Sequence, residues 1–277
     1  MYYLGCPECG ETVFGDKEVC PYCGFAGFGE YKRQKEHELN NLQDKLNARQ
    51  PASGEAGGHA YVDLGLPSGT LWATCNIGAK APMDYGKYFA WGETAPKKDW
   101  TCYNWENYKY CNGTHNSITK YCDRKQYGNK GFTDKLKALE PADDAAVALW
   151  GDEWRMPTYN DATELLQHCK CDIIRLNDFD VCRFTGSNGN YLLLPAAGHL
   201  GPIDDGIGKY GRYWLSSIGT SQPDYVWCIF SNSENCGLTD EHRRYGLTIR
   251  PVCVRTRPTS RTNQDTPGLK PIGPLTE

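Results

Sequence analysis

Short apolar runs separated by turn signals recur along most of the chain. Residues 61–66 alternate between apolar and polar, and a second apolar run at 70–75 follows a Pro-Ser-Gly turn, so we predict a β-hairpin there. Three further runs, rich in Leu, Val, Ile and aromatic residues, predict strands at 191–194, 226–230 and 246–252. The last third of the chain is therefore expected to be mainly β.

Helical periodicity is confined to a few segments. Leu39, Leu42 and Leu46 follow one another at spacings of three and four within a charged stretch. This pattern predicts a solvated helix over residues 30–50 with one narrow apolar stripe. Three leucines are fewer than a coiled coil requires, although they leave weak self-association open.

A capping signal predicts the start of another helix. Thr158 and Asp161 have the spacing of a capping box, and apolar residues follow at helical intervals, so we expect a helix that begins near Pro157. Residues 143–150 predict a shorter one. A few helices followed by a run of short strands are typical of an α+β domain, here with long irregular loops.

Composition divides the chain into four parts. Residues 1–28 hold two paired-cysteine motifs, and residues 29–59 comprise the predicted helix and a Gly- and Ser-containing stretch that we interpret as a flexible linker. Residues 60–255 form the main domain. Residues 256–277 contain four prolines and few apolar residues, which predicts an extended or disordered tail.

The first part has the spacing of a zinc ribbon. Two Cys-x-x-Cys motifs, each followed by Gly, supply four thiolates, the ligand set that zinc binds as a tetrahedron. The candidate ligands are Cys6, Cys9, Cys20 and Cys23. A unit of this size cannot stabilise itself by burial, so metal binding would contribute roughly 10 kcal/mol or more to its folding.

Two other interpretations of these cysteines stay open, namely two disulfides or a redox Cys-x-x-Cys pair. Both fit less well, because two matched pairs occur without a surrounding βαβ pattern. Since all four coordination positions are filled by the protein, we predict a structural zinc and not a catalytic one.

Charge and hydropathy exclude several classes of protein. The formal net charge of −4 argues against a chain that coats nucleic acid, and residues 1–28 hold one Lys and no Arg against four acidic residues. No apolar run is long enough for a membrane helix, and the first residues lack the features of a signal peptide. We therefore expect a cytoplasmic protein, or a virion-associated one if a phage encodes it.

Six sequence blocks carry a resemblance to a known family. They are LWATCNIGA at 71–79, YGKYFAWGE at 85–93, WRMPT at 154–158, LPAAG at 194–198, GRYWLSS at 211–217 and GLTIRPV at 246–252. In this order they resemble the Fibrobacter-type major paralogous domain family. That family resembles a branch of the C-type-lectin-like fold. Formylglycine-generating (sulfatase-modifying) domains and the variable proteins of diversity-generating retroelements have the same fold.

The resemblance implies a fold and a binding role. The expected fold is a small antiparallel sheet with two helices, long loops on one side, and pairing between the first and last strands. The motif residues, among them Trp72, Trp91 and Trp214, are interpreted as scaffold, because each tryptophan covers a large apolar area.

Residues 218–245 lie between two scaffold blocks and hold the candidate ligand-binding positions. Their aromatic, Ser, Asn, Asp and Arg side chains resemble those of a paratope. By resemblance to retroelement-diversified proteins, the positions expected to face a protein or other macromolecular ligand are Asp224, Tyr225, Trp227, Ser231, Asn232, Glu234, Asn235, Asp240, His242 and Arg244. The alternative is an ordinary polar surface. The ribbon and its helix would contact a second partner or another copy of the chain.

An enzymatic alternative comes from the same resemblance. Formylglycine-generating domains act through a close cysteine pair near the end of the domain, together with bound metal. Cys228, Cys236 and Cys253 are the late cysteines here, and their spacing does not match such a pair. We therefore predict a non-enzymatic binding protein and keep an oxidase of that type as the alternative.

The chain has fourteen cysteines, ten of them outside the ribbon. Cys169 and Cys171 are two residues apart and give no site by spacing. Without a signal sequence, and beside a zinc-thiolate site, we interpret these ten as reduced thiols.

Overall fold

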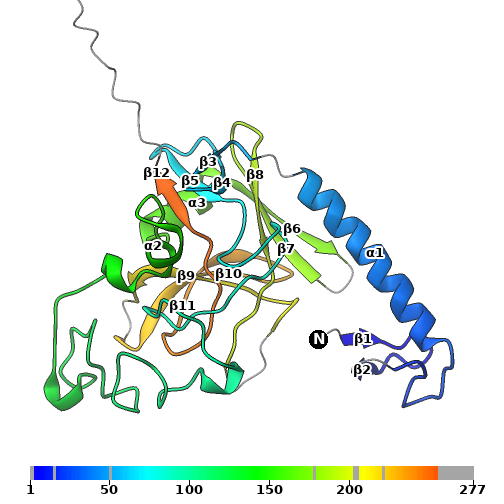
Figure 1. The fold of residues 1–277 in the computed structure, drawn as a ribbon, viewed down its shortest axis with the longest axis horizontal. Coiled ribbons are helices and arrows are strands. Elements are labelled where there is room, and N and C mark those ends of the chain that lie inside the picture. The colour runs from blue at the N-terminus through cyan, green and yellow to red at the C-terminus, as the bar shows by residue number, and fades with distance from the viewer. Residues whose placement is uncertain are drawn as a thin grey trace, which may run out of the picture.

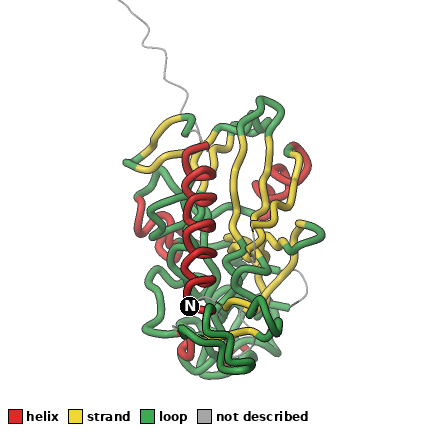
Figure 2. Tube along the Cα trace, turned by 90° about the vertical axis from the view of Figure 1, so that its right-hand side faces the viewer, coloured by secondary structure: helices red, strands yellow, loops and turns green. Residues whose placement is uncertain are grey.

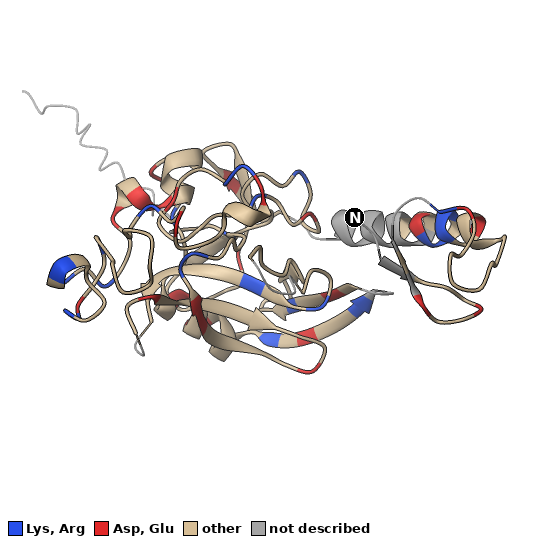
Figure 3. Cartoon of the chain, turned by 90° about the horizontal axis from the view of Figure 1, so that it is seen from below, with Lys and Arg blue, Asp and Glu red and all other residues tan. Residues whose placement is uncertain are grey.

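A small two-stranded unit and a long helix precede the main body of the chain (Figure 1). The computed structural model describes residues 3–14, 17–49, 52–176, 179–201, 206–219 and 222–254. Strands β1 (Tyr3–Gly5) and β2 (Thr12–Phe14) pair antiparallel, and helix α1 spans Phe28–Arg49, which confirms the helix expected at 30–50. The tail predicted at 256–277 lies outside the described residues. Lys and Arg are interspersed with Asp and Glu along the first half of α1 (Figure 3).

The main domain begins with a four-stranded antiparallel sheet in the order β12-β5-β4-β3. Its strands are β3 (Gly54–Ala56), β4 (His59–Val62), β5 (Thr70–Ala73) and β12 (Val252–Val254). β4 pairs with β5, which confirms the hairpin predicted between 61 and 75. The last strand, β12, pairs with β5 and not with β4, the first strand of the predicted hairpin.

The prediction of a flexible linker before residue 60 is wrong for residues 54–58. β3 pairs with β4 across Gly57 and Gly58, whose φ values are +50° and +78°. Two-residue hairpins of type I′ require positive φ at both central positions, which glycine adopts without strain. The Ala56 carbonyl also accepts a 2.9 Å hydrogen bond from the Trp154 indole, so this hairpin is part of the main domain.

Two further antiparallel sheets have three strands each. One has the order β6-β7-β8 and consists of β6 (Lys170–Leu176), β7 (Phe179–Thr185) and β8 (Tyr191–Pro195). The other has the order β11-β10-β9 and consists of β9 (Gly211–Ile218), β10 (Tyr225–Ser231) and β11 (Cys236–His242). The predicted strands at 191–194 and 226–230 are confirmed.

The strand predicted at 246–252 is largely wrong. Only Val252 belongs to a strand, while Leu247 and Thr248 form isolated bridges to Phe89 and Tyr213. This segment is extended, but its successive residues pair with different parts of the chain.

Short helices complete the main domain. α2 (Ala145–Trp150) is capped by Asp144, and α3 (Tyr159–His168) starts with the capping box that the sequence predicts. Three 3-10 turns lie at Trp100–Cys102, Asn129–Gly131 and Pro141–Asp143. Figure 2 shows that loops make up much of the main domain. The chain therefore has a mixed α+β structure with small antiparallel sheets and few helices.

Buried tryptophans hold this loop-rich domain together. The side chains of Trp72, Trp91, Trp154 and Trp214 are fully buried. The Trp91 indole donates to the Leu215 carbonyl at 2.8 Å, so one side chain fills the core and also satisfies a backbone acceptor. Among the described residues, no helix has the length and hydropathy needed to cross a membrane.

Candidate functional site

The four N-terminal cysteines occupy two turns of the same construction. The Gly10 N–H donates to the Cys6 carbonyl at 2.8 Å, and the Gly24 N–H donates to the Cys20 carbonyl at 2.9 Å. Both glycines have positive φ, +77° and +75°, a conformation that a side chain at this position would disfavour. Each turn therefore presents two sulfur atoms on one edge.

The sulfur atoms of the two turns come together. All four lie within 4.8 Å of one another, with Cys6 Sγ 3.7 Å from Cys23 Sγ and Cys9 Sγ 3.8 Å from Cys20 Sγ. Zinc–sulfur bonds of about 2.3 Å in a tetrahedron place neighbouring sulfurs about 3.8 Å apart. Cys6, Cys9, Cys20 and Cys23 can thus hold one metal ion, and their spacing agrees with zinc.

A small apolar cluster supports this metal centre. Cys6, Val13, Cys20 and Phe28 are buried together, so the ribbon packs against the start of α1. Burial opposes ionisation of Cys20, but hydrogen bonds from the backbone N–H groups of Cys23 and Tyr22 outweigh it. They lower the pKa of this thiol to about 7. At Cys23, a hydrogen bond from the Phe25 backbone is outweighed by burial and the neighbouring thiols, which raise the pKa to about 12, so a bound metal would have to displace protons from part of the set.

Half of the ten candidate ligand-binding residues lie on strands β10 and β11, and the other half lie in the turns beside them. β10 and β11 pair over their full lengths, with Tyr225 opposite His242 and Trp227 opposite Asp240. Directly opposite residues of an antiparallel pair share a face, as do residues two apart on one strand. Tyr225, Trp227, Asp240 and His242 therefore lie on one face, which we call the β10–β11 face.

Side chains from distant segments gather at one end of this face. The Tyr225 and His242 rings lie 4.0 Å apart, and Asp224 Oδ2 lies 3.5 Å from His242 Nδ1. The Arg244 guanidinium lies 5.7 Å from the centre of the Trp105 ring. The Trp105 and His242 rings meet edge to face, with their centres 5.7 Å apart. Four of the ten predicted residues are thus brought together, and Trp105 joins them from a segment that the sequence analysis did not include.

Several polar atoms of this group are buried without a hydrogen-bond partner among the described residues. They are Asp224 Oδ1, His242 Nδ1 and Arg244 Nε. Because leaving a buried donor or acceptor unpaired costs about 1 to 3 kcal/mol, such atoms mark a place where a ligand or water can bind. Asp224 is only 2% exposed, so it would act from beneath the surface rings.

The remaining candidates have different positions. Ser231 is 6% exposed, and Asn232 accepts hydrogen bonds from the backbone of Glu234 and Asn235, both at 2.9 Å. Asn232 therefore stabilises the turn between β10 and β11, while Glu234 and Asn235 are exposed at its tip. These residues lie at the end of the hairpin opposite to Tyr225 and His242.

The late cysteines do not form one group. Among the described residues, Cys228 and Cys253 belong to neither of the two clusters of metal-ligating side chains, whereas Cys236 joins Cys171 and Cys182. Burial raises the pKa of the Cys228 thiol to about 12, which keeps it protonated at neutral pH.

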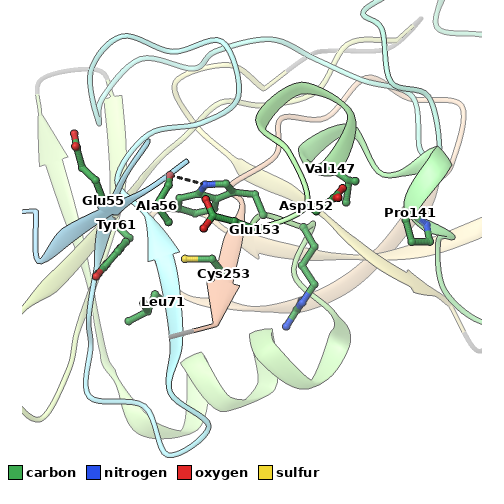
Figure 4. Close-up of a pocket in the computed structure, with 11 residues that line it drawn as sticks. Glu55, Ala56, Tyr61, Leu71, Pro141, Val147, Asp152, Glu153 and Cys253 are labelled. Atoms are coloured by element: carbon green, nitrogen blue, oxygen red, sulfur yellow. Dashed lines mark hydrogen bonds between the residues drawn. The ribbon is translucent and has the colours of Figure 1, made fainter. Parts of the chain in front are cut away.

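A separate pocket of about 760 Å³ opens beside β5 and β12 (Figure 4). Its lining includes the carboxylates of Glu55, Asp152 and Glu153, the Arg155 side chain and the Cys253 thiol. Sequence reasoning gave no signal for this pocket, because its residues come from distant parts of the chain.

No family model, no curated protein and no solved structure matches this chain.

Proposed function

We propose that this chain is a non-enzymatic binding protein whose β10–β11 face, with its neighbours Trp105 and Arg244, binds a protein or other macromolecular ligand. The observation that carries the proposal is the group of Tyr225, His242 and Arg244, in which close-packed rings lie beside buried polar atoms that lack a hydrogen-bond partner among the described residues. Aromatic and Arg side chains contribute most of the binding energy at protein interfaces.

The fold proposed for the main domain is C-type-lectin-like. Its support is the set of six sequence blocks in order, in a domain of small antiparallel sheets and few helices. Within that proposal, residues 218–245 are the segment that retroelement-diversified relatives vary. Sequencing the DNA beside the gene tests this version. Absence of both a reverse transcriptase gene and a near-copy of the coding sequence for residues 212–250 would remove it.

We assign the N-terminal site to structural zinc. Its support is a closed set of four thiolates with tetrahedral spacing. Zinc thiolates persist in a reducing compartment, and we therefore place the protein in the cytoplasm. The ribbon and α1 would attach the binding domain to a second partner or to another copy of the chain.

Ligand capture by matched variants tests the proposed face. The immobilised full chain is incubated with an extract of its source organism, and the retained proteins are quantified by mass spectrometry. The partner is the protein that the wild-type chain retains. We expect Tyr225→Ala and Arg244→Ala each to lower its retention at least tenfold, equivalent to about 1.4 kcal/mol of binding free energy.

Leu149→Ala is the control, because Leu149 is an exposed apolar residue on α2, outside the β10–β11 face. Each variant is first checked for an unchanged circular dichroism spectrum. Equal retention by all variants would show that residues 218–245 form an ordinary polar surface.

A further inference from the structure

Three cysteines that are distant in sequence meet inside the main domain. Cys171 on β6, Cys182 on β7 and Cys236 on β11 bring their sulfur atoms within 4.8 Å of one another. Spacing alone gives Cys171 no site, whereas the structure places its sulfur beside those of two other cysteines. We call these three residues the cysteine triad.

Strand pairing explains how the triad forms. Cys182 is opposite Ile173 in the β6–β7 ladder, so Cys171 and Cys182 are diagonal neighbours on one face of that sheet. Cys236 comes from the separate β11-β10-β9 sheet, where it is opposite Ser231. All three side chains lie in or against the same apolar cluster, so the sulfurs lie between two sheets that share no backbone ladder.

A disulfide accounts for only part of this arrangement. The structure joins Cys171 to Cys236, but Cys182 Sγ lies 2.9 Å from Cys171 Sγ, so a third sulfur converges on the same point. The Cα atoms of Cys171 and Cys236 are 7.2 Å apart, whereas disulfides usually have Cα separations of about 4.4–6.8 Å. Cysteines that share a metal ion are not subject to this limit.

We propose that Cys171, Cys182 and Cys236 form a second metal site, in which three thiolates hold one soft cation between the two sheets. Metal–sulfur bonds of about 2.3 Å place sulfurs about 3.8 Å apart in a tetrahedron and about 4.0 Å apart in a trigonal plane. The three sulfurs lie within 4.8 Å of one another, and Cys171 Sγ and Cys182 Sγ are closer than a shared ion requires, at 2.9 Å. A bound ion would therefore move these two sulfurs about 1 Å further apart. Thiolates select Zn²⁺ or Cu⁺, with water as the fourth ligand of Zn²⁺.

This site differs from the N-terminal centre in its structural effect. The ribbon metal folds a local unit, whereas the triad metal links strands from two sheets. β11 also carries Asp240 and His242 of the β10–β11 face. A bound cation would therefore fix the position of that face relative to the β6-β7-β8 sheet, whether or not the face binds the proposed ligand.

Metal titration of the full chain tests the site. The reduced protein is stripped of metal and titrated anaerobically with Zn²⁺ or, in a separate experiment, with Cu⁺, and bound metal is measured by mass spectrometry. We expect the wild type to bind two ions per chain in at least one of the two titrations, one ion for each cysteine cluster. Cys182→Ala should retain only the ribbon ion, and the double variant Cys6→Ala/Cys9→Ala, which leaves two thiolates in the ribbon, only the triad ion.

Cys169→Ala is the matched control, because Cys169 is buried in the same apolar cluster but its sulfur is outside the triad. It should bind two ions like the wild type. If Cys182→Ala does not fold, Cys236→Ala at a half-buried position replaces it. One ion per chain in the wild type, lost in the Cys6→Ala/Cys9→Ala variant, would overturn the proposal. The proposal would also be overturned if protein alkylated at cell lysis contained a Cys171–Cys236 disulfide.

Discussion

We expect Asp161→Ala to destabilise the main domain strongly, because this carboxylate connects three parts of the fold. Its Oδ2 accepts hydrogen bonds from the Thr158 N–H at 2.7 Å and the Thr158 hydroxyl at 2.6 Å. Both oxygens also pair with the Arg155 guanidinium, at 2.7 Å and 3.0 Å. Oδ1 accepts a further bond from Thr70 on β5 at 3.3 Å. The capping box, the segment before α3 and the first sheet thus share one side chain.

The expected loss follows from these contacts. Removing the Asp161 half of the capping box costs up to about 1 kcal/mol, because the Thr158 cap itself remains. Breaking a fully buried ion pair costs about 3 to 5 kcal/mol, but the Arg155 side chain is 35% exposed and can recover water, which lowers that contribution. Together we expect about 3 kcal/mol. A domain of this size loses about 2 to 4 °C in Tm per kcal/mol, so Tm should fall by about 6 to 12 °C.

Thermal denaturation followed by near-UV circular dichroism measures this change. Thr163→Ala is the control, because Thr163 lies on the same helix and its hydroxyl only donates to the Tyr159 carbonyl, at an exposed position. Such a surface change should stay within about 0.5 kcal/mol. If Asp161→Ala lowers Tm no more than Thr163→Ala does, the carboxylate does not hold these elements together and the reasoning fails.

The same residue predicts a pH dependence. Burial opposes ionisation of Asp161, but its bonds from Arg155 and Thr158 lower the pKa of the carboxyl below its ordinary value. A carboxyl with a depressed folded-state pKa stabilises the fold above its unfolded pKa, about 3.9, and loses this contribution as the pH falls through the folded value. The Tm difference between wild type and Asp161→Asn should therefore shrink below about pH 4.

Three other predictions concern the core and the cysteines. Arg250 is fully buried and donates to the Asn76 side chain at 2.7 Å and to the Thr74 carbonyl at 2.8 Å. Arg250→Met should lower the free energy of unfolding by about 3 kcal/mol, measured in urea, and Arg250→Lys should restore it only in part because an ammonium lacks the guanidinium fork. Burial raises the pKa of Cys228 to about 12, so this thiol should resist iodoacetamide in the native protein, while the half-exposed Cys75 should react. Peptide mass spectrometry measures the labelling, and equal labelling of both cysteines would contradict this prediction. In the Cys182→Ala variant, which lacks the triad site, chelation of zinc should abolish hydrogen-exchange protection in residues 3–28 without changing the Tm of the main domain, and retained protection in that segment would argue for disulfides instead.

Local signals account for the elements that the sequence predicts well. The hairpin of β4 and β5 and the capping box of α3 depend on residues close in the chain, so pattern reasoning finds them. The sequence does not predict β11, because its residues, CGLTDEH, lack the apolar–polar alternation that marks a strand. The β3–β4 turn had a signal in Gly57 and Gly58, but the surrounding composition favoured a linker.

The same distinction applies to the sites. The ribbon cysteines are visible from spacing alone, because each turn supplies two ligands. The cysteine triad has sequence separations of 11 and 65 residues and depends on strand register and sheet packing, which one sequence does not reveal. Trp105 likewise reaches the β10–β11 face only through the fold.

The pairing of β12 with β5 has a consequence for the order of folding during synthesis. Val252 is opposite Trp72, so the ladder closes a loop of about 180 residues. β5 therefore lacks one neighbour until nearly all of the main domain has left the ribosome, and contacts of such high sequence separation form slowly. The ribbon needs only its own residues and a metal ion. We expect it to fold first, before the main domain has its last strand.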